Sequence, residues 1–174
     1  MAEIKVILGD ITNLDVDVIV NAAKSSLKGG SGVDGAIHSK AGSELLAECL
    51  NIGGCMTGDA KITKGYNLKS KHIIHTVRPV WQDDKSGERE SLIQCYTNSL
   101  ILAEENNLKK IAFPCISTGA YGFPYKIAAK IALDTIKNFS YKSIEEITFC
   151  CYENRDYEEY QKVLKGNFLK KLFK

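Results

Sequence analysis

The sequence predicts one domain, residues 1–174, folded as a three-layer α/β/α sandwich with a mixed, largely parallel central sheet. Short apolar, β-branched runs alternate with longer segments of helical period, and this order is typical of layered α/β folds. Residues 16–20 and 111–113 are almost continuously apolar, as expected of central strands that are covered on both faces. A length of 174 residues suits one domain with a substantial core.

Each predicted strand is a short run rich in apolar and β-branched residues. The strands are expected at residues 4–8, 16–20, 60–65, 71–76, 110–114 and 146–151. The helices are expected at residues 35–50, 88–106, 125–139 and 156–172. The last helix carries lysines opposite an apolar face, so we interpret them as a solvated surface rather than a nucleic-acid patch. These residues are Lys162, Lys165, Lys170, Lys171 and Lys174.

The composition is that of a soluble globular protein, with 44% hydrophobic and 25% charged residues. A net charge of +2 indicates no polyanion surface, so no nucleic-acid partner is expected. No apolar run reaches bilayer-spanning length and no signal peptide is visible, so we expect a cytoplasmic protein without a membrane partner. The six cysteines form no C-x-x-C pair, which favours free thiols over disulfides or a zinc site.

A glycine-rich segment, residues 28–38, lies between a predicted buried strand and a helix. Glycines let the backbone approach a ligand, and free N–H groups at a helix start attract anions, so we expect a phosphate-holding loop. Gly30, Gly32 and Gly35 also satisfy G-x-G-x-x-G, the dinucleotide fingerprint. That alternative is rejected, because residues 22–28 separate the glycines from the strand and no strand with an acidic end follows about 20 residues later.

A second segment of small residues and glycines, residues 116–124, also lies between a buried strand and a helix. Tyr121 and Phe123 supply either a ring face for a sugar or anchors in the core. Two such loops in one small sheet predict a crevice at the carboxyl ends of the strands. A diphosphate held from two sides by main-chain amides would fit that crevice.

Polar side chains follow the first two strands. Asp10 comes directly after the first strand, where its carboxylate either accepts from an exocyclic amino group or caps the turn that Thr12 continues. Asn21 places an amide at the end of the second strand. Asp34 is interpreted either as a helix N-cap or as a functional acid, and His38 and His75 as structural residues.

Together these segments resemble the macrodomain family, and within it the MacroD-type ADP-ribosyl hydrolases, which include O-acetyl-ADP-ribose deacetylases. The matching segments are residues 9–12, 20–23, 32–38, 58–63, 75–77 and 117–124. They keep the family's order and spacing over nearly the whole chain. The resemblance implies a single macrodomain that needs no metal and no cofactor.

The resemblance also implies how ADP-ribose would be bound. Asp10 would hold the adenine amino group, Ile11 would contribute a main-chain amide, and Tyr152 would pack on the adenine. Tyr121 would stack beside the distal ribose. The residues that would wrap the diphosphate are Gly30, Ser31, Gly32 and Val33 in the first loop and Ser117, Thr118, Gly119, Ala120, Tyr121 and Gly122 in the second.

For catalysis, the resemblance implies that Asp34 orients or deprotonates a water that attacks the ester on the distal ribose. Such water activation is worth roughly 10²–10⁴-fold in rate. Asn21 would support the distal sugar, and Lys24 stands at a third catalytic position, where many family members have a second asparagine. The implied partners are ADP-ribose, an acylated ADP-ribose such as O-acetyl-ADP-ribose, and proteins mono-ADP-ribosylated on Asp or Glu.

Three positions depart from the family pattern: Lys24, Ser31 in place of a third glycine, and Arg78, because glycine often follows the segment that matches residues 75–77. An ammonium only donates, whereas an amide both donates and accepts. Lys24 therefore either reaches a ribose hydroxyl or a phosphate, or is an ordinary solvated side chain. A module that binds ADP-ribose without cleaving it is the alternative function, and Lys24 supports it.

Overall fold

The sheet is central to the computed structural model, which describes residues 2–172, with side chains described to residue 166. Within those residues, six strands are arranged in the order β1-β6-β5-β2-β4-β3. The pairs β1–β6, β6–β5, β5–β2 and β2–β4 are parallel, and edge strand β3 is antiparallel to β4. The strands are β1 (Glu3–Leu8), β2 (Val18–Ala23), β3 (Ala60–Lys64), β4 (His72–Val77), β5 (Lys110–Phe113) and β6 (Glu146–Cys151). The predicted mixed, largely parallel sheet is confirmed.

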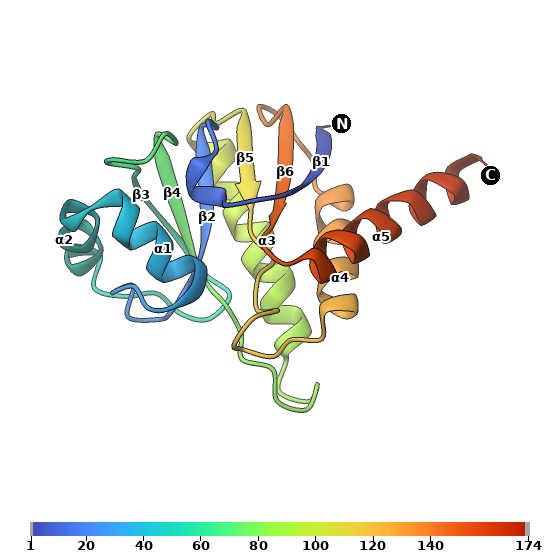
Figure 1. The fold of residues 1–174 in the computed structure, drawn as a ribbon, viewed down its shortest axis with the longest axis horizontal. Helices are drawn as coiled ribbons and strands as arrows, with labels where there is room; N and C mark the ends of the chain where they lie inside the picture. The colour runs from blue at the N-terminus through green and yellow to red at the C-terminus, as the bar shows by residue number, and fades with distance from the viewer. Residues whose placement is uncertain (1, 173–174) are drawn as a thin grey trace.

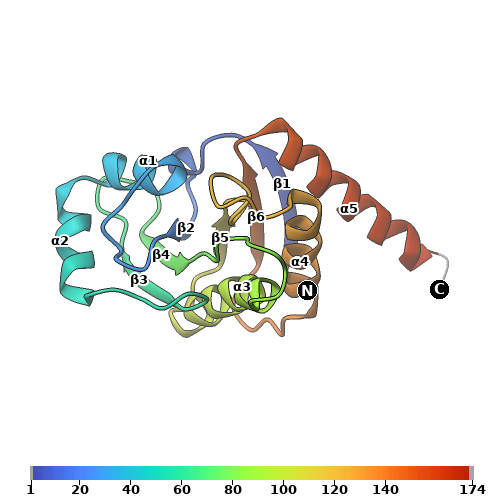
Figure 2. The same ribbon diagram turned by 90° about the horizontal axis from the view of Figure 1, so that it is seen from below.

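Helices cover both faces of the sheet (Figures 1 and 2). The helices α1 (Gly32–Ala41) and α2 (Ser43–Ile52) pack on one face, and α3 (Glu88–Glu105) and α4 (Tyr125–Asn138) pack on the other. The helix α5 (Asn154–Leu172) packs on α4 and edge strand β1. A short 3₁₀ helix, η1 (Ile11–Asn13), follows β1 and was not predicted. The α/β/α sandwich is therefore confirmed.

One predicted helix, residues 35–50, is wrong as a single element, because it is two helices broken at Gly42. Gly42 has φ 94° and ψ 178°, a backbone conformation that L side chains rarely adopt. The first of the two, α1, begins at Gly32, so Asp34 lies in its first turn and Ser31 is the N-cap residue. The interpretation of Asp34 as an N-cap is therefore wrong.

Two apolar clusters, one on each face, hold the sheet between its helices. On the α3–α4 face, four aromatic rings stack in sequence, with centroid distances of 5.1 Å for Tyr96–Phe113, 6.0 Å for Phe113–Phe149 and 4.7 Å for Phe149–Tyr160. All four side chains are fully buried. Because they come from α3, β5, β6 and α5, they fix β5, from whose end the second predicted ligand loop leaves, together with its neighbour β6.

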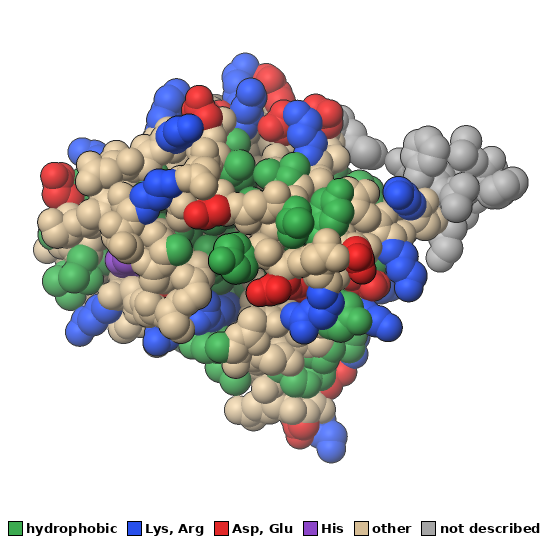
Figure 3. Space-filling view, viewed as in Figure 1, with side chains coloured by type: hydrophobic (Ala, Val, Ile, Leu, Met, Phe, Trp, Pro, Cys, Tyr) green, Lys and Arg blue, Asp and Glu red, His purple; other side chains and the backbone are tan. Residues whose placement is uncertain are grey.

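Charges of both signs are interspersed on the face drawn in Figure 3, consistent with the small net charge. None of the helices within residues 2–172 is both long and apolar enough to cross a membrane. Lys162 and Lys165 are exposed on α5 as predicted, whereas the side chains of Lys170, Lys171 and Lys174 lie outside the described residues. The six cysteines are free thiols.

Gly65, at the end of β3, provides a test of the fold. Its N–H donates to Lys71 O (2.8 Å), and a Cβ added there would lie 1.9 Å from Ser70 O. We expect Gly65→Ala to lower the free energy of unfolding by more than about 2 kcal/mol, because backbone must move. The control is Gly166→Ala, an exposed α5 position with no atom within 4 Å of the added Cβ, which should cause no loss. Urea unfolding of both variants measures this, and equal stabilities would contradict it.

Candidate functional site

The two glycine-containing loops leave the same edge of the sheet. Residues 24–31 follow β2 and residues 114–124 follow β5, and these two strands are parallel neighbours. Both loops therefore lie at the carboxyl ends of the strands, on the lower side of the sheet in the view of Figure 1. In open α/β sheets this edge is the usual place for a ligand. The two loops predicted to border a crevice therefore lie at the same edge of the sheet.

The first loop is shaped by close backbone contacts. Gly29 and Gly32 have φ values of 82° and 60°, in the region that favours glycine. A Cβ at Gly35 would lie 2.3 Å from Gly30 O, so α1 packs directly on the loop backbone. The loop ends at Ser31, where the first N–H groups of α1 have no acceptor within the helix. This arrangement offers main-chain donors and the positive end of a helix to an anion.

The second loop is anchored by hydrogen bonds of buried residues, and its outer residues are exposed to solvent. Ser117, with φ 67°, donates its hydroxyl to Pro79 O (2.9 Å), and its own carbonyl accepts from Phe123 N–H (3.0 Å). Phe123 is buried against Trp81, with ring centroids 4.7 Å apart, so the structure favours its interpretation as a core anchor. The outer residues of the loop are exposed, namely Gly119, Ala120 and Gly122. The buried part, which includes Thr118, thus supports an exposed rim.

Tyr121 lies at the rim beside an unpredicted residue, Arg78. The Arg78 guanidinium lies 4.1 Å from the centroid of the Tyr121 ring, and its Nη1 donates to Ala22 O (2.6 Å). Arg78 follows β4, Ala22 is in β2 and Tyr121 is in the loop after β5. Arg78 therefore connects the ends of three strands.

A buried polar pair lies beneath the first loop. Asn21 and Asp34 are 0% and 1% exposed, and Asn21 Nδ2 donates to Asp34 Oδ1 (2.8 Å). The amide oxygen of Asn21, Oδ1, and the second carboxylate oxygen of Asp34, Oδ2, have no hydrogen-bond partner among the described residues. Buried polar atoms without partners are uncommon, so these two atoms point to a ligand or a water.

Lys24 lies close to this pair. A Cβ placed on Gly30 would be 3.0 Å from Lys24 Nζ and 3.2 Å from Asp34 Oδ2. The ammonium and the carboxylate thus both lie on the side of Gly30 to which a Cβ would point. The three residues predicted for catalysis, Asp34, Asn21 and Lys24, are brought together by β2 and α1.

Two histidines that the sequence indicated only as structural residues border the pair. His38 Nε2 lies 3.7 Å from Asp34 Oδ1. Burial lowers the pKa of His38, and the Asp34 carboxylate opposes that shift. His75 is fully buried, its Nδ1 lies 3.0 Å from Asn21 Nδ2, and burial lowers its pKa to about 3.

The residues predicted for adenine lie after β1 and β6. Asp10 Oδ1 accepts from both the backbone N–H of Thr12 (2.9 Å) and its hydroxyl (2.7 Å), and these bonds lower the pKa of Asp10. The turn-cap interpretation is thus confirmed, but the turn does not use the second oxygen. Ile11 is buried in the core, which leaves only its main chain for a ligand, and Tyr152 is 80% exposed. Because β1 and β6 are parallel neighbours, these residues share one edge of the sheet.

Among the residues that the structure describes, a metal would have to use His38, Cys49 and His75, whose donor atoms lie within 4.8 Å of one another. His75 fits this role poorly. Its Nδ1 accepts from Asn21, so its Nε2 carries the proton and donates to Thr63 Oγ1 (3.0 Å). Burial also raises the pKa of Cys49 to about 11, which disfavours a thiolate ligand. The cluster is better explained by hydrogen bonding and packing.

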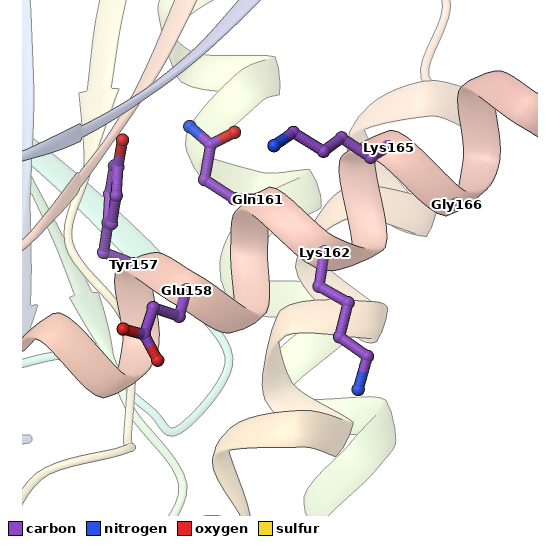
Figure 4. A pocket seen from close by; sticks show the side chains of 6 residues that line it. All are labelled: Tyr157, Glu158, Gln161, Lys162, Lys165 and Gly166. Carbon is purple, nitrogen blue, oxygen red and sulfur yellow. The ribbon is translucent and has the colours of Figure 1, made fainter.

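A hollow lies along α5 (Figure 4). It is lined by Tyr157, Glu158, Gln161, Lys162, Lys165 and Gly166. The side chains leave one helix in different directions and do not converge on a common point. This hollow is not a candidate for the chemistry.

The fold and the edge define a class of protein: an open α/β module with two backbone loops at the carboxyl ends of neighbouring parallel strands. Residues 20–132 match the Macro domain family, and relatives cover more than nine-tenths of the chain, so the chain belongs to the macro domain family.

Two relatives illustrate the likeness. The chain is 52% identical over 163 residues to a macro domain-containing protein of Methanosarcina mazei, covering 92% of this chain and 87% of that protein. It is 52% identical over 164 residues to the human ADP-ribose glycohydrolase MACROD2, covering 92% of this chain but only 39% of that protein.

Solved structures agree with these relatives. The Oceanobacillus iheyensis macrodomain with ADP has a TM-score of 0.89 and 44% identity, with 95% of this chain and 91% of that chain covered. The Trypanosoma brucei macrodomain in complex with ADP-ribose has a TM-score of 0.88 and 40% identity, with 93% and 69% covered. The resemblance inferred from the sequence is confirmed.

Burial of the two histidines predicts how stability depends on pH. Burial lowers the pKa of His75 from 6.5 to about 3 and also lowers that of His38. Between these two pH values the unfolded chain therefore binds more protons than the folded chain. The free energy of unfolding is therefore not reduced by these rings above about pH 6.5. As the pH drops below that value it falls, by up to about 1.4 kcal/mol per pH unit for each ring.

Urea unfolding between about pH 7.5 and 5 measures this effect above the range in which most carboxyl groups titrate. Substitution of His75→Asn removes one of the two rings and should reduce the slope. A wild-type free energy of unfolding that is flat over this range would contradict the assignment.

Proposed function

We propose that this chain binds ADP-ribose and hydrolyses the ester that joins its distal ribose to an acyl group. The observation that carries the proposal is the buried Asp34, which has one oxygen held by Asn21 and the other without a partner beside the first loop. The names of the relatives support it, because one is an ADP-ribose glycohydrolase and solved macrodomains hold ADP and ADP-ribose. The acyl group would be acetate or an Asp or Glu side chain of a protein.

The ligand would lie along the carboxyl edge of the sheet. The diphosphate would accept from the main chain of the two loops and from the start of α1. The free oxygen of Asp10 would accept from the adenine amino group, with the Tyr152 ring on the base. The distal ribose would then reach Asn21 Oδ1 and the ring of Tyr121. This orientation brings the ester to Asp34.

Asp34 would act as a general base. A water donating to Oδ2 would lose its proton as its oxygen attacks the acyl carbonyl carbon, and the bond between that carbon and the ribose oxygen would break. The proton would pass to the departing ribose oxygen, which gives ADP-ribose and a free acid. A buried carboxylate held on one side by an amide is suited to this step, because its position and orientation are set in advance.

Lys24 favours the alternative function, a module that binds ADP-ribose or mono-ADP-ribosylated proteins without cleaving them. Its ammonium lies next to Gly30 and donates only, whereas an asparagine there would also accept. If its charge holds the phosphate or the attacking water in place, turnover and binding both proceed. If it holds Asp34 away from the water, only binding remains.

The role of Asp34 is tested by Asp34→Asn, which preserves shape and the acceptor for Asn21. We expect turnover of O-acetyl-ADP-ribose to fall by at least about 100-fold while affinity for ADP-ribose changes little. Product release and calorimetry measure the two quantities. Asp15→Asn, an exposed carboxylate before β2, is the matched control and should behave as wild type. Asp10→Ala should show the reverse pattern, with weaker ADP-ribose binding.

Equal turnover by the wild type and Asp34→Asn would refute the catalytic role. Tight binding of ADP-ribose by a wild type without turnover would establish the binding module instead. Unchanged affinity in Asp10→Ala would refute the adenine assignment.

The role of Lys24 is tested by Lys24→Asn. An amide supplies both a donor and an acceptor beside Asp34, so we expect kcat on O-acetyl-ADP-ribose to rise by roughly threefold to tenfold. Lys28→Asn, an exposed lysine in the same segment, is the control for loss of charge alone. A fall in kcat for Lys24→Asn would mean that the ammonium has a productive role.

A further inference from the structure

A chain of hydrogen bonds continues from Asp34 into the core. Asn21 Nδ2 lies 2.8 Å from Asp34 Oδ1 and 3.0 Å from His75 Nδ1, and His75 Nε2 lies 3.0 Å from Thr63 Oγ1. Thr63 in turn donates its hydroxyl to Lys64 O (3.1 Å). This chain of hydrogen bonds therefore joins α1, β2, β4 and β3. Its four members, Asn21, Asp34, His75 and Thr63, are all at least 98% buried.

Sheet register places these residues together. Asn21 and His75 are direct partners in the parallel pairing of β2 and β4. Thr63 is paired with Ile73, two residues from His75, in the antiparallel pairing of β3 and β4. Side chains at such positions point to the same face of a sheet. Three of the four side chains are thus placed by strands of the sheet, and the fourth, Asp34, is placed by α1.

Each donor and acceptor in the chain has one consistent assignment. The carboxylate oxygen of Asp34 accepts, so Asn21 must turn its NH₂ group toward it. The second hydrogen of that NH₂ group points to His75 Nδ1, which must therefore accept. A neutral imidazole has one donor and one acceptor, so Nε2 carries the hydrogen and donates to Thr63, whose own hydrogen goes to Lys64 O.

We propose that His75 is a positioning residue for the hydrolysis: as the Nε2–H tautomer, fixed by Thr63, it holds the Asn21 amide in one orientation. This inference rests on the proposed function of the site. In the opposite orientation, Asn21 Oδ1 would face the Asp34 carboxylate and the lone pair of His75. With both hydrogens of Nδ2 committed inward, Asn21 Oδ1 stays available to a ribose hydroxyl and Asp34 Oδ2 stays turned toward the first loop.

The surroundings of His75 keep it neutral. The titratable groups near it are Asp34 and His38 from α1, Cys49 from α2, whose Sγ lies 4.0 Å from Nε2, and the exposed Lys61, its partner in the pairing of β3 and β4. Asp34 contacts Asn21 rather than the ring itself. A proton added at Nδ1 would oppose the Asn21 NH₂ group. The series of hydrogen bonds from Asp34 to Thr63 therefore requires a neutral His75 ring.

Two substitutions at His75 separate its two nitrogens. His75→Asn would place an amide oxygen close to the position of Nδ1, where it still accepts from Asn21. His75→Gln would reach the position of Nε2 and leave Nδ1 without a replacement. We expect kcat to fall about tenfold in His75→Gln and less than about threefold in His75→Asn, because only the former loses the acceptor.

The affinity for ADP-ribose distinguishes positioning from general damage. Its Kd should change less than about threefold in both variants, because the diphosphate and adenine contacts lie on other residues. Thr63→Val, which removes the acceptor for Nε2–H, should lower kcat, whereas Thr63→Ser should restore it. Thermal unfolding of each variant identifies any that fail to fold.

The tautomer is measured directly, without turnover, by ¹⁵N NMR of the imidazole in the wild-type chain. We expect hydrogen on Nε2 and none on Nδ1 at neutral pH. Hydrogen on Nδ1, or equal losses of kcat in the folded His75→Gln and His75→Asn variants, would overturn the positioning role. Absence of wild-type turnover would refute the proposed hydrolysis and with it the role in that reaction, whereas the wrong tautomer in an active enzyme would refute the positioning role alone.

Discussion

The hydrogen bond from Asn21 to Asp34 is the interaction on which the site depends. It joins the end of a central strand to the first turn of α1, and it satisfies one carboxylate oxygen in a place from which solvent is excluded. A buried carboxylate without such a partner would be costly, and a fully satisfied one would have nothing to offer a ligand. Asp34 lies between these cases, because Oδ1 is held and Oδ2 is not.

The close packing of α1 against the first loop sets where that free oxygen lies. Gly35 allows α1 to touch the backbone of Gly30, and any side chain at Gly35 would push the two apart. This contact brings the helix start, the loop and Asp34 to the same point as Lys24. Binding of an anion and activation of a water would therefore share one small region, in which a change at any of these positions affects both.

Much of this arrangement could be predicted from the sequence, because it rests on residue types with specific backbone or chemical requirements. The two glycine-containing loops were predicted, since clustered glycines after buried strands cost backbone entropy and add no packing. Asn21 was predicted to lie at the rim from its place at a strand end, whereas the catalytic role of Asp34 was implied only by the family resemblance. The role of His75 could not be predicted, because its partner Asn21 is 54 residues away and only the register of β2 and β4 shows that they meet. The roles of the site residues and a cytoplasmic location stay predictions.

The break between α1 and α2, which the sequence did not predict, also explains how His75 is buried. A continuous helix over residues 35–50 would carry its second half straight on along the direction of α1. The break at Gly42 turns α2 so that Leu45 and Cys49 pack into the cluster that includes Ile73 of β4. Cys49 thereby covers His75, and burial of the ring is what keeps it neutral. A glycine with no contact to the ligand loops thus contributes to the orientation of Asn21, and through it to Asp34.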